Sequence, residues 1–286
     1  MTRTRRLLVA AAAATAAALA LAACSSGGSG GGSGASTSSA DFGYVNQGKL
    51  TIATAEPAYS PWVQDDKPES GKGFEAAVAY AVAGKLGFAK DDVTWVRTTF
   101  DQAIAPGPKT FDVNLQQFSI TDERKKAVDF SSPYYETTQA VVTTEDSPAA
   151  KATSLADLKK LTIGAQSATT SFDAAEKSIA PTGGVQAFNS NDDAKLALES
   201  KQVDAIVVDL PTAFYLRDAE LKKGVIVGQL PKVAGQKGDE FGLVLAKGSP
   251  LTKKVSAAVD ALRADGTLDE LAQKWLAADG DAPVLK

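Results

Sequence analysis

The segment that decides the fold lies near the middle of the chain, where residues 116–124 read QQFSITDER. Thr121 is placed to cap a helix, because a threonine oxygen can accept a hydrogen bond from a backbone N–H group in the first helical turn. Arg124 then falls in that first turn, where its charge opposes the positive end of the helix dipole. A bound carboxylate would compensate this charge, and so would an ion pair with Asp122 or Asp129 on the same helix. The residues alone leave both alternatives open.

Around this segment, apolar patterns of strand and helix alternate along the chain. Short β-rich runs lie at 50–53, 93–96, 112–115, 139–143, 161–165 and 203–208, and helical patterns lie at 73–86, 170–180 and 191–200. This alternation is typical of α/β proteins whose parallel sheets are covered by helices on both sides. Polar stretches near 143–147 and 236–240 divide the body, 41–286, loosely. The pattern therefore predicts a two-lobed α/β fold.

Three helices have recognisable start signals. Ser154 is a predicted N-cap, Asn191 is predicted to cap the helix that runs to Ser200, and Thr267 with Glu270 forms a predicted capping box. Each places a short polar side chain where the first backbone N–H groups of a helix need acceptors.

The N-terminal residues predict a signal peptide followed by a flexible tether. Three arginines precede an apolar, alanine-rich run that ends at residues 21–24, LAAC, which looks like a bacterial lipobox. We therefore expect a lipoprotein signal peptide at 1–23 and a Gly/Ser-rich tether at 24–40. The lipid on Cys24 would anchor the mature protein to the membrane.

Composition excludes several classes of function. The chain has no histidine, which removes the commonest general base and metal ligand and excludes a Ser-His-Asp or Cys-His mechanism. Its single cysteine, Cys24, cannot form an intramolecular disulfide. With 30 Lys+Arg against 34 Asp+Glu the net charge is −4, which argues against a nucleic-acid partner.

Polar and aromatic side chains at the ends of predicted strands are candidates for binding. Residues 167–171, SATTS, can bind an anion through their hydroxyl and N–H groups or simply cap a helix. Asp209 follows the strand 203–208, at the edge where open α/β sheets place their ligands, and can pair with an ammonium group or act as an N-cap. Tyr59 and Phe100 can enclose a ligand side chain or belong to the core.

Read together, these segments resemble the polar amino-acid family of ABC-transporter solute-binding lipoproteins. The resemblance rests mainly on residues 119–135, SITDERKKAVDFSSPYY, with weaker matches at 48–53, 73–75, 157–158, 203–205, 265–268 and 274–275. It implies the type II periplasmic-binding-protein fold: two α/β lobes, each a mixed, mostly parallel sheet with flanking helices, joined by two hinge crossings. We expect lobe 1 at 41–142 and 238–286, and lobe 2 at 143–237.

The resemblance also implies which residues hold the common part of an amino acid. Arg124 matches the residue that binds the α-carboxylate, and Asp209 matches the acceptor for the α-ammonium group. Ser119 belongs to the shell around these groups, and Thr169 and Thr170 match the hydroxyl and N–H donors of the second lobe. A zwitterion needs one cation and one anion placed apart, which these residues would supply from different lobes.

The ligand side chain would meet a second set of residues. Tyr59 and Phe100 match the aromatics that stack on it, and Glu56 matches an acidic position at its far end. Gln116 and Gln117 depart from the family pattern, which has small residues there, and would narrow the pocket or bind a larger polar ligand. Glu56 favours a side chain with N–H donors, so an amide or cationic amino acid is expected.

The resemblance implies an extracytoplasmic receptor of an ABC importer. Its partners would be a small-molecule amino acid, the membrane permease and the membrane itself. We expect a monomer that needs no cofactor or metal and is not an enzyme. The alternative is a dehydratase-like enzyme on the same fold, acting on a small carboxylate, in which Glu56 or Asp209 would serve as acid or base.

Overall fold

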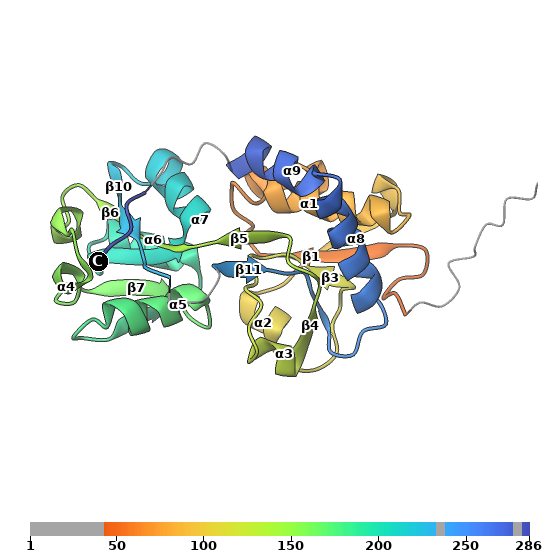
Figure 1. Cartoon of the computed structure of the whole chain (residues 1–286), viewed down its shortest axis with the longest axis horizontal. Helices are drawn as coiled ribbons and strands as arrows, with labels where there is room; N and C mark the ends of the chain where they lie inside the picture. Colours follow the sequence, from red (N-terminus) through yellow and green to blue (C-terminus); the bar gives the residue numbers. More distant parts are fainter. Residues whose placement is uncertain (1–42, 233–237, 277–281) are drawn as a thin grey trace, which may run out of the picture. The chain divides into compact units, whose positions relative to one another are not determined.

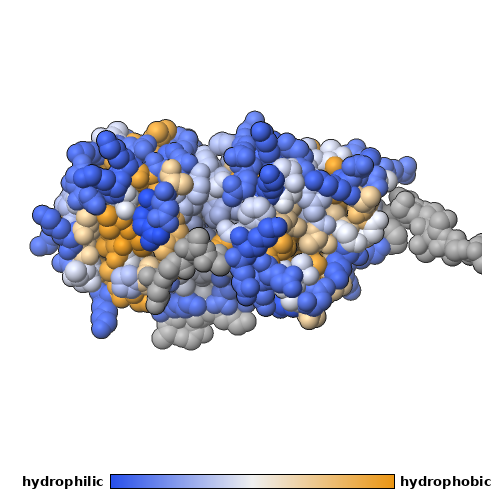
Figure 2. All heavy atoms as spheres, turned by 90° about the horizontal axis from the view of Figure 1, so that it is seen from above, coloured by the Kyte–Doolittle hydropathy of each residue, from blue (hydrophilic) through white to orange (hydrophobic). Residues whose placement is uncertain are grey.

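The computed structural model describes residues 43–232, 238–276 and 282–286. The predicted signal peptide, 1–23, and tether, 24–40, lie outside the described residues, and so does Cys24. Within the described part of the chain, no helix has the length and apolar character needed to cross a membrane. Figure 2 shows hydrophilic residues over much of one face, with apolar patches between them.

The first sheet contains five strands in the order β2-β1-β3-β12-β4. Strand β1 pairs in parallel with β2 and β3, whereas β12 pairs antiparallel with β3 and β4. One face is covered by α1, α8 and α9, and the other by α2 and α3 (Figure 1). The strands are β1 (Leu50–Thr54), β2 (Val93–Arg97), β3 (Val113–Asn114), β4 (Val128–Phe130) and β12 (Val244–Ala246). The helices are α1 (Phe74–Lys85), α2 (Phe100–Ile104), α3 (Arg124–Ala127), α8 (Thr252–Ala264) and α9 (Thr267–Leu276).

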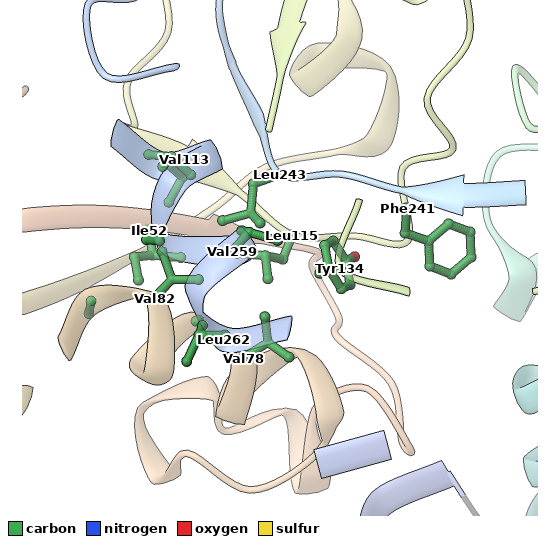
Figure 3. Packing of buried hydrophobic residues seen from close by; sticks show 14 of the residues in the cluster. Ile52, Val78, Val82, Val113, Leu115, Tyr134, Phe241, Leu243, Val259 and Leu262 are labelled. Atoms are coloured by element: carbon green, nitrogen blue, oxygen red, sulfur yellow. The ribbon is translucent and has the colours of Figure 1, made fainter. Parts of the chain in front are cut away.

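The core of this lobe forms where the helical and strand patterns of the sequence meet. Figure 3 shows Ile52, Val113 and Leu243, from strands and the segment before β12, facing the helices. Val78 of α1 and Leu262 of α8 close the cluster from the other side. All of these side chains are almost completely removed from water, so the hydrophobic effect holds the helices on the sheet.

The second sheet has the order β10-β6-β9-β7-β8. Strands β10, β6 and β9 are antiparallel neighbours, and β9, β7 and β8 are parallel ones. Helices lie on both faces, over two separate apolar clusters. The strands are β6 (Gln139–Thr144), β7 (Ile163–Gln166), β8 (Val185–Phe188), β9 (Ala205–Asp209) and β10 (Gly224–Gln229). The helices are α4 (Leu155–Leu158), α5 (Thr170–Ala174), α6 (Asn191–Glu199) and α7 (Leu210–Tyr215).

Short helical turns complete the described elements. Turns of 3₁₀ helix lie at Gln64–Asp66, Pro68–Ser70, Lys90–Asp92 and Pro148–Lys151, and α5 and α7 continue as π-helical turns at Ala175–Ile179 and Leu216–Glu220.

Two hinge strands connect the sheets, as predicted. Strand β5 (Tyr135–Thr137) runs from the first sheet towards the second, and β11 (Asp239–Phe241) pairs antiparallel with it. Figure 1 shows both between the two groups of elements. The strand that follows each crossing runs in the opposite direction to its neighbours. Thus β6 is antiparallel to β10 and β9, and β12 is antiparallel to β3 and β4. Both sheets are therefore more antiparallel than the predicted mostly parallel arrangement.

The C-terminal residues differ from the predicted division into lobes. Residues 282–286 were expected in lobe 1, but Val284 pairs with Gln229 of β10, and Leu285 is buried in a cluster of the second sheet. The C-terminus consequently lies beside the second sheet (Figure 1). Gly228 permits this contact, because a Cβ atom there would lie 2.6 Å from the carbonyl oxygen of Pro283.

The predicted helix starts are correct in one of three cases. Ser154 forms a complete capping box with Asp157. The prediction for Asn191 is wrong: Ser190 accepts the hydrogen bond from Asp193 N, and Asn191 is already helical. Thr267 is likewise inside α9, and Asp265 Oδ1 accepts from its backbone N at 3.1 Å. In both errors an adjacent or nearby polar residue competes for the same role.

Candidate functional site

A cavity of about 310 Å³ is lined by residues of both sheets and their helices. It brings together eight of the ten predicted site residues: Phe100, Gln116, Gln117, Ser119, Arg124, Thr169, Thr170 and Asp209. Two further lining residues, Gln166 and Asn191, were missed as site residues, and Ser171 was considered only as part of the candidate anion-binding segment 167–171. Gln166 ends a parallel strand, β7, and Asn191 begins α6, so their positions at element ends were a usable signal.

Arg124 lies buried at the start of α3 with its guanidinium in the cavity wall. Its Nη1 donates to Ser119 O at 2.8 Å, and its Nη2 donates to Ala168 O at 2.7 Å. The guanidinium also lies 5.2 Å from the ring centre of Phe100, a cation–π contact. Burial lowers the pKa of Arg124 from its ordinary value. Its two hydrogen-bond acceptors are neutral carbonyl oxygens, and the negative charges of Asp239, Asp209 and Asp173 act on it from further away.

Neither ion pair considered for Arg124 from the sequence is formed. Asp122 pairs with Lys125 at 3.2 Å, and Asp129 pairs with Lys247 at 3.2 Å. Thr121 Oγ1 accepts from Arg124 N at 3.1 Å, but α3 begins at Arg124 with Glu123 at its N-cap, so Thr121 lies before the cap position and not at it as predicted. Among the described residues, no carboxylate lies at ion-pair distance from Arg124. A carboxylate from outside the protein therefore has a ready partner here.

Asp209 stands at the carboxyl end of β9, and its side chain makes no capping bond to α7. Its Oδ1 accepts from Gln139 Nε2 at 2.8 Å, and the same Nε2 donates to Asp239 Oδ2 at 2.6 Å. Burial first, and then the negative charges of Asp239 and Glu75, raise the pKa of Asp209 to about 7. A cation in the cavity would stabilise its ionised form.

The hydroxyl residues at the start of α5 serve the fold and connect the lobes. Thr169 Oγ1 accepts from Phe172 N at 3.1 Å and donates to Gln166 O at 2.6 Å, so its hydroxyl caps the helix. Thr170 Oγ1 lies 3.0 Å from Ser119 Oγ, across the cavity. The capping alternative is therefore realised for Thr169, while Thr170 contacts the opposite lobe.

Glu56 and Tyr59 lie apart from this cavity. Tyr59 lines a neighbouring cavity of about 380 Å³ with Trp62 and Thr212, and Asn191 lines both cavities. The hydroxyl of Tyr59 is buried without a hydrogen-bond partner among the described residues. Glu56 is exposed and lines neither cavity. Its expected contact with a ligand stays a prediction.

Among the described residues, no group of three or more His, Cys, Asp or Glu side chains could hold a metal ion. What the cavity offers is a guanidinium, a carboxylate, amides and hydroxyls, which are groups that bind a small polar solute by charge and hydrogen bonds.

Two α/β lobes, two hinge strands and a cavity with opposite charges from the two lobes together define a solute-binding protein. The family model for bacterial extracellular solute-binding proteins, family 3, matches residues 50–278. The chain belongs to this family.

Relatives and solved structures agree with this assignment. The L-arginine-binding protein of Pseudomonas aeruginosa is 32% identical over 230 residues, which are 78% of this chain and 86% of that protein. An ancestral arginine-binding protein bound to arginine is 32% identical, with a TM-score of 0.65, over 80% of this chain and 98% of that one. An ancestral amino-acid-binding protein described as a precursor of cyclohexadienyl dehydratase is 33% identical, with a TM-score of 0.66, over 80% and 95%.

Proposed function

We propose that the protein is the extracytoplasmic receptor of an ABC importer and that it captures a polar amino acid between its two lobes. The observation that carries the proposal is the placement of Arg124 and Asp209 in one cavity. Arg124 comes from the first lobe and Asp209 from the second. An amino acid carries a carboxylate and an ammonium group on the same carbon and so complements both charges.

Closure of the lobes follows from the same arrangement. A ligand that pairs with Arg124 and Asp209 at once binds best when both lobes contact it, because each ion pair strengthens as water leaves the site. The closed form would then be recognised by the permease. We further propose that the lipid on Cys24 and the tether 24–40 hold this receptor, as a monomer, at the membrane surface.

Binding without catalysis is the simpler function for this site. The solved relative described as a precursor of a dehydratase keeps the alternative of an enzyme on this fold open. Asp209, whose pKa is about 7, would be the candidate acid or base. Incubation with the bound amino acid decides between the two: a receptor returns it unchanged, and an enzyme releases a product.

The direct test follows the thermal midpoint of the protein with each standard amino acid in turn. A ligand at about 100 times its Kd adds about 2.7 kcal/mol to the free energy of unfolding, a shift of several degrees. The shift should vanish in Arg124→Ala and in Asp209→Asn. It should persist in Lys125→Ala, a matched control because Lys125 lies on the same helix with its side chain exposed. No shift with any amino acid would refute the proposal.

A further inference from the structure

Two of the glutamines that line the cavity, Gln116 and Gln117, point their amide N–H groups at the protein. Gln116 Nε2 donates to Thr98 Oγ1 at 2.8 Å and to Asn114 Oδ1 at 3.1 Å. Gln117 donates through both its backbone N and its Nε2 to the carboxylate of Glu75. No described residue donates to either Oε1, and neither oxygen is a buried atom lacking a partner. The amide oxygens are therefore what these side chains leave to the cavity that they line.

Glu75 dictates this orientation for Gln117 without lining the cavity itself. It lies fully buried in the first turn of α1. Its Oε1 accepts from Gln117 N at 2.7 Å and from the hydroxyl of Tyr134, and its Oε2 accepts from Gln117 Nε2. An ionised carboxylate can only accept hydrogen bonds. In this ionised form, Glu75 holds the N–H groups of Gln117 and turns its Oε1 the other way.

The backbone of Gln117 indicates that the side chain has a use. Its φ of +51° lies in the left-handed region, which glycine adopts freely and a residue with a side chain adopts at a cost in stability. The bonds to Glu75 offset that cost. A glycine would need no such support, so what glutamine adds at this position is its amide oxygen at the cavity wall.

The charges around the cavity also favour a ligand with an additional positive charge. An amino acid would pair its carboxylate with Arg124 and its ammonium group with Asp209, which balances those two residues. Asp239 shares Gln139 Nε2 with Asp209, and Glu75 lies directly behind Gln117. Among the described groups in this network, carboxylates outnumber cations. A further positive charge on the ligand would reduce the imbalance.

We propose that Glu75 is a positioning residue that sets ligand selectivity, an inference that rests on the proposed function. By holding the amide of Gln117, it makes this wall of the cavity accept hydrogen bonds. The site then prefers amino acids whose side chain is a cation with several N–H donors, a guanidinium or an ammonium group. Amide and carboxylate side chains bind more weakly, because their oxygens meet the oxygens of Gln116 and Gln117.

Calorimetric titration of the purified protein with L-arginine, L-lysine, L-glutamine and L-glutamate tests this preference. We expect arginine or lysine to bind at least about tenfold more tightly than glutamine, the difference that one charge-assisted hydrogen bond supplies. Glutamate should bind more weakly still.

The decisive variant is Glu75→Gln. The new amide oxygen can still accept from Gln117 N and Tyr134, but its NH₂ group now needs an acceptor. The amide of Gln117 would turn over to supply its oxygen and present its own NH₂ group to the cavity. The affinity for the cationic ligand should fall about tenfold while that for glutamine is kept or rises, so the preference is lost.

Gln117→Gly is a second, independent variant that removes the oxygen while fitting the backbone. It should weaken cationic ligands and spare glutamine, and it decides the question if Glu75→Gln fails to fold. Lys201→Gly is the matched control: Lys201 also has a left-handed backbone, with a φ of +60°, but is exposed in the second lobe. The ligand selectivity of the Lys201→Gly variant should equal that of the unmodified protein.

The results of these titrations distinguish failure of the proposed receptor function from failure of the role proposed for Glu75. If the unmodified protein binds none of the standard amino acids, the proposed function itself is refuted. If it binds glutamine or glutamate as tightly as arginine and lysine, or if both variants weaken all ligands equally, the role of Glu75 is overturned and the receptor function stands.

Discussion

At the scale of single residues, buried carboxyl groups are the feature that separates this site from an ordinary protein surface. Glu75 is fully buried and Asp209 is half-buried, and burial is the main reason that the pKa of each is raised to about 7. Ordinary values are about 4.3 for Glu and 3.9 for Asp. The free protein therefore holds these groups partly protonated near neutral pH, ready to ionise when a cation enters the cavity.

These pKa shifts predict how the stability of the ligand-free protein depends on pH. Between about pH 4 and pH 7 the folded protein binds more protons than the unfolded chain, so its free energy of unfolding falls as pH rises. We expect the thermal midpoint to fall from pH 5 to pH 8, and Asp209→Asn and Glu75→Gln to reduce that fall. Glu270→Gln, an exposed carboxyl on α9, serves as the control. A fall of equal size in all four proteins would contradict the assignment.

At the scale of elements, local capping determines where several short helices begin. In α4, Ser154 Oγ accepts from Asp157 N at 3.3 Å, and Asp157 Oδ2 accepts from Ser154 N at 3.0 Å. These bonds satisfy N–H groups that a helix start leaves without partners. In a helix of only four residues, they are a large part of what defines the element.

We predict that Ser154→Ala lowers the free energy of unfolding by about 1 kcal/mol. The thermal midpoint should fall by about 2–4 °C in a protein of this size. The comparison is Ser200→Ala at the end of α6, whose hydroxyl donates to Ala197 O and caps no helix start. Equal midpoints for the two variants would mean that the capping box contributes nothing beyond a surface hydroxyl.

At the scale of the whole molecule, contacts between lobes and the C-terminal segment tie the two halves together. Trp62 Nε1 donates to Thr212 Oγ1 at 3.0 Å, from the first lobe to the second, and both side chains are buried. Helix α9 packs on the first lobe, whereas residues 282–286 pack on the second. The chain therefore contributes to the second lobe once more after its two hinge strands.

Thr212→Val should favour separation of the lobes. The substitution keeps the shape of the side chain but leaves the buried N–H group of Trp62 without an acceptor, which costs about 1–3 kcal/mol in this arrangement. Small-angle X-ray scattering of the ligand-free protein should show a larger radius of gyration. Thr182→Val is the control, because the Thr182 hydroxyl bonds only within the second lobe, to Lys159 O. An unchanged radius in Thr212→Val would exclude a holding role for this bond.

The C-terminal contact predicts opposite results for two neighbouring residues. Leu285 is 3% exposed in the core of the second lobe, whereas Val284 is 57% exposed. Leu285→Ala should cost about 2–4 kcal/mol through lost burial and the cavity that it leaves. Val284→Ala should change the free energy of unfolding by less than about 0.5 kcal/mol. Urea unfolding of both variants measures the difference, and similar losses would argue against specific docking of Leu285.

Much of the candidate site was predictable because its residues sit at the ends of elements that local patterns reveal. Arg124 and Asp209 follow recognisable strands, and parallel or hinge-connected strands bring such ends together. The resemblance to a family then selected Arg124 and Asp209 as expected ligand contacts, whereas Thr169, expected as a ligand donor, caps α5. The predictions for Asn191 and Thr267 failed because several neighbouring polar residues can cap the same helix, and only the backbone geometry selects one.

Local periodicity and motifs within short segments were enough to predict the α/β alternation and the two-lobed family fold. The pair of opposite charges for a ligand came from the family resemblance and stays a prediction. Three features could be found only in the folded protein: Glu75 bonds to Gln117, residues 282–286 join the second lobe, and Glu56 lies apart from the cavity. Each of these depends on which segments distant in the chain are neighbours in space. Such contacts arise from the packing of the whole fold and leave no signal in any one stretch of sequence.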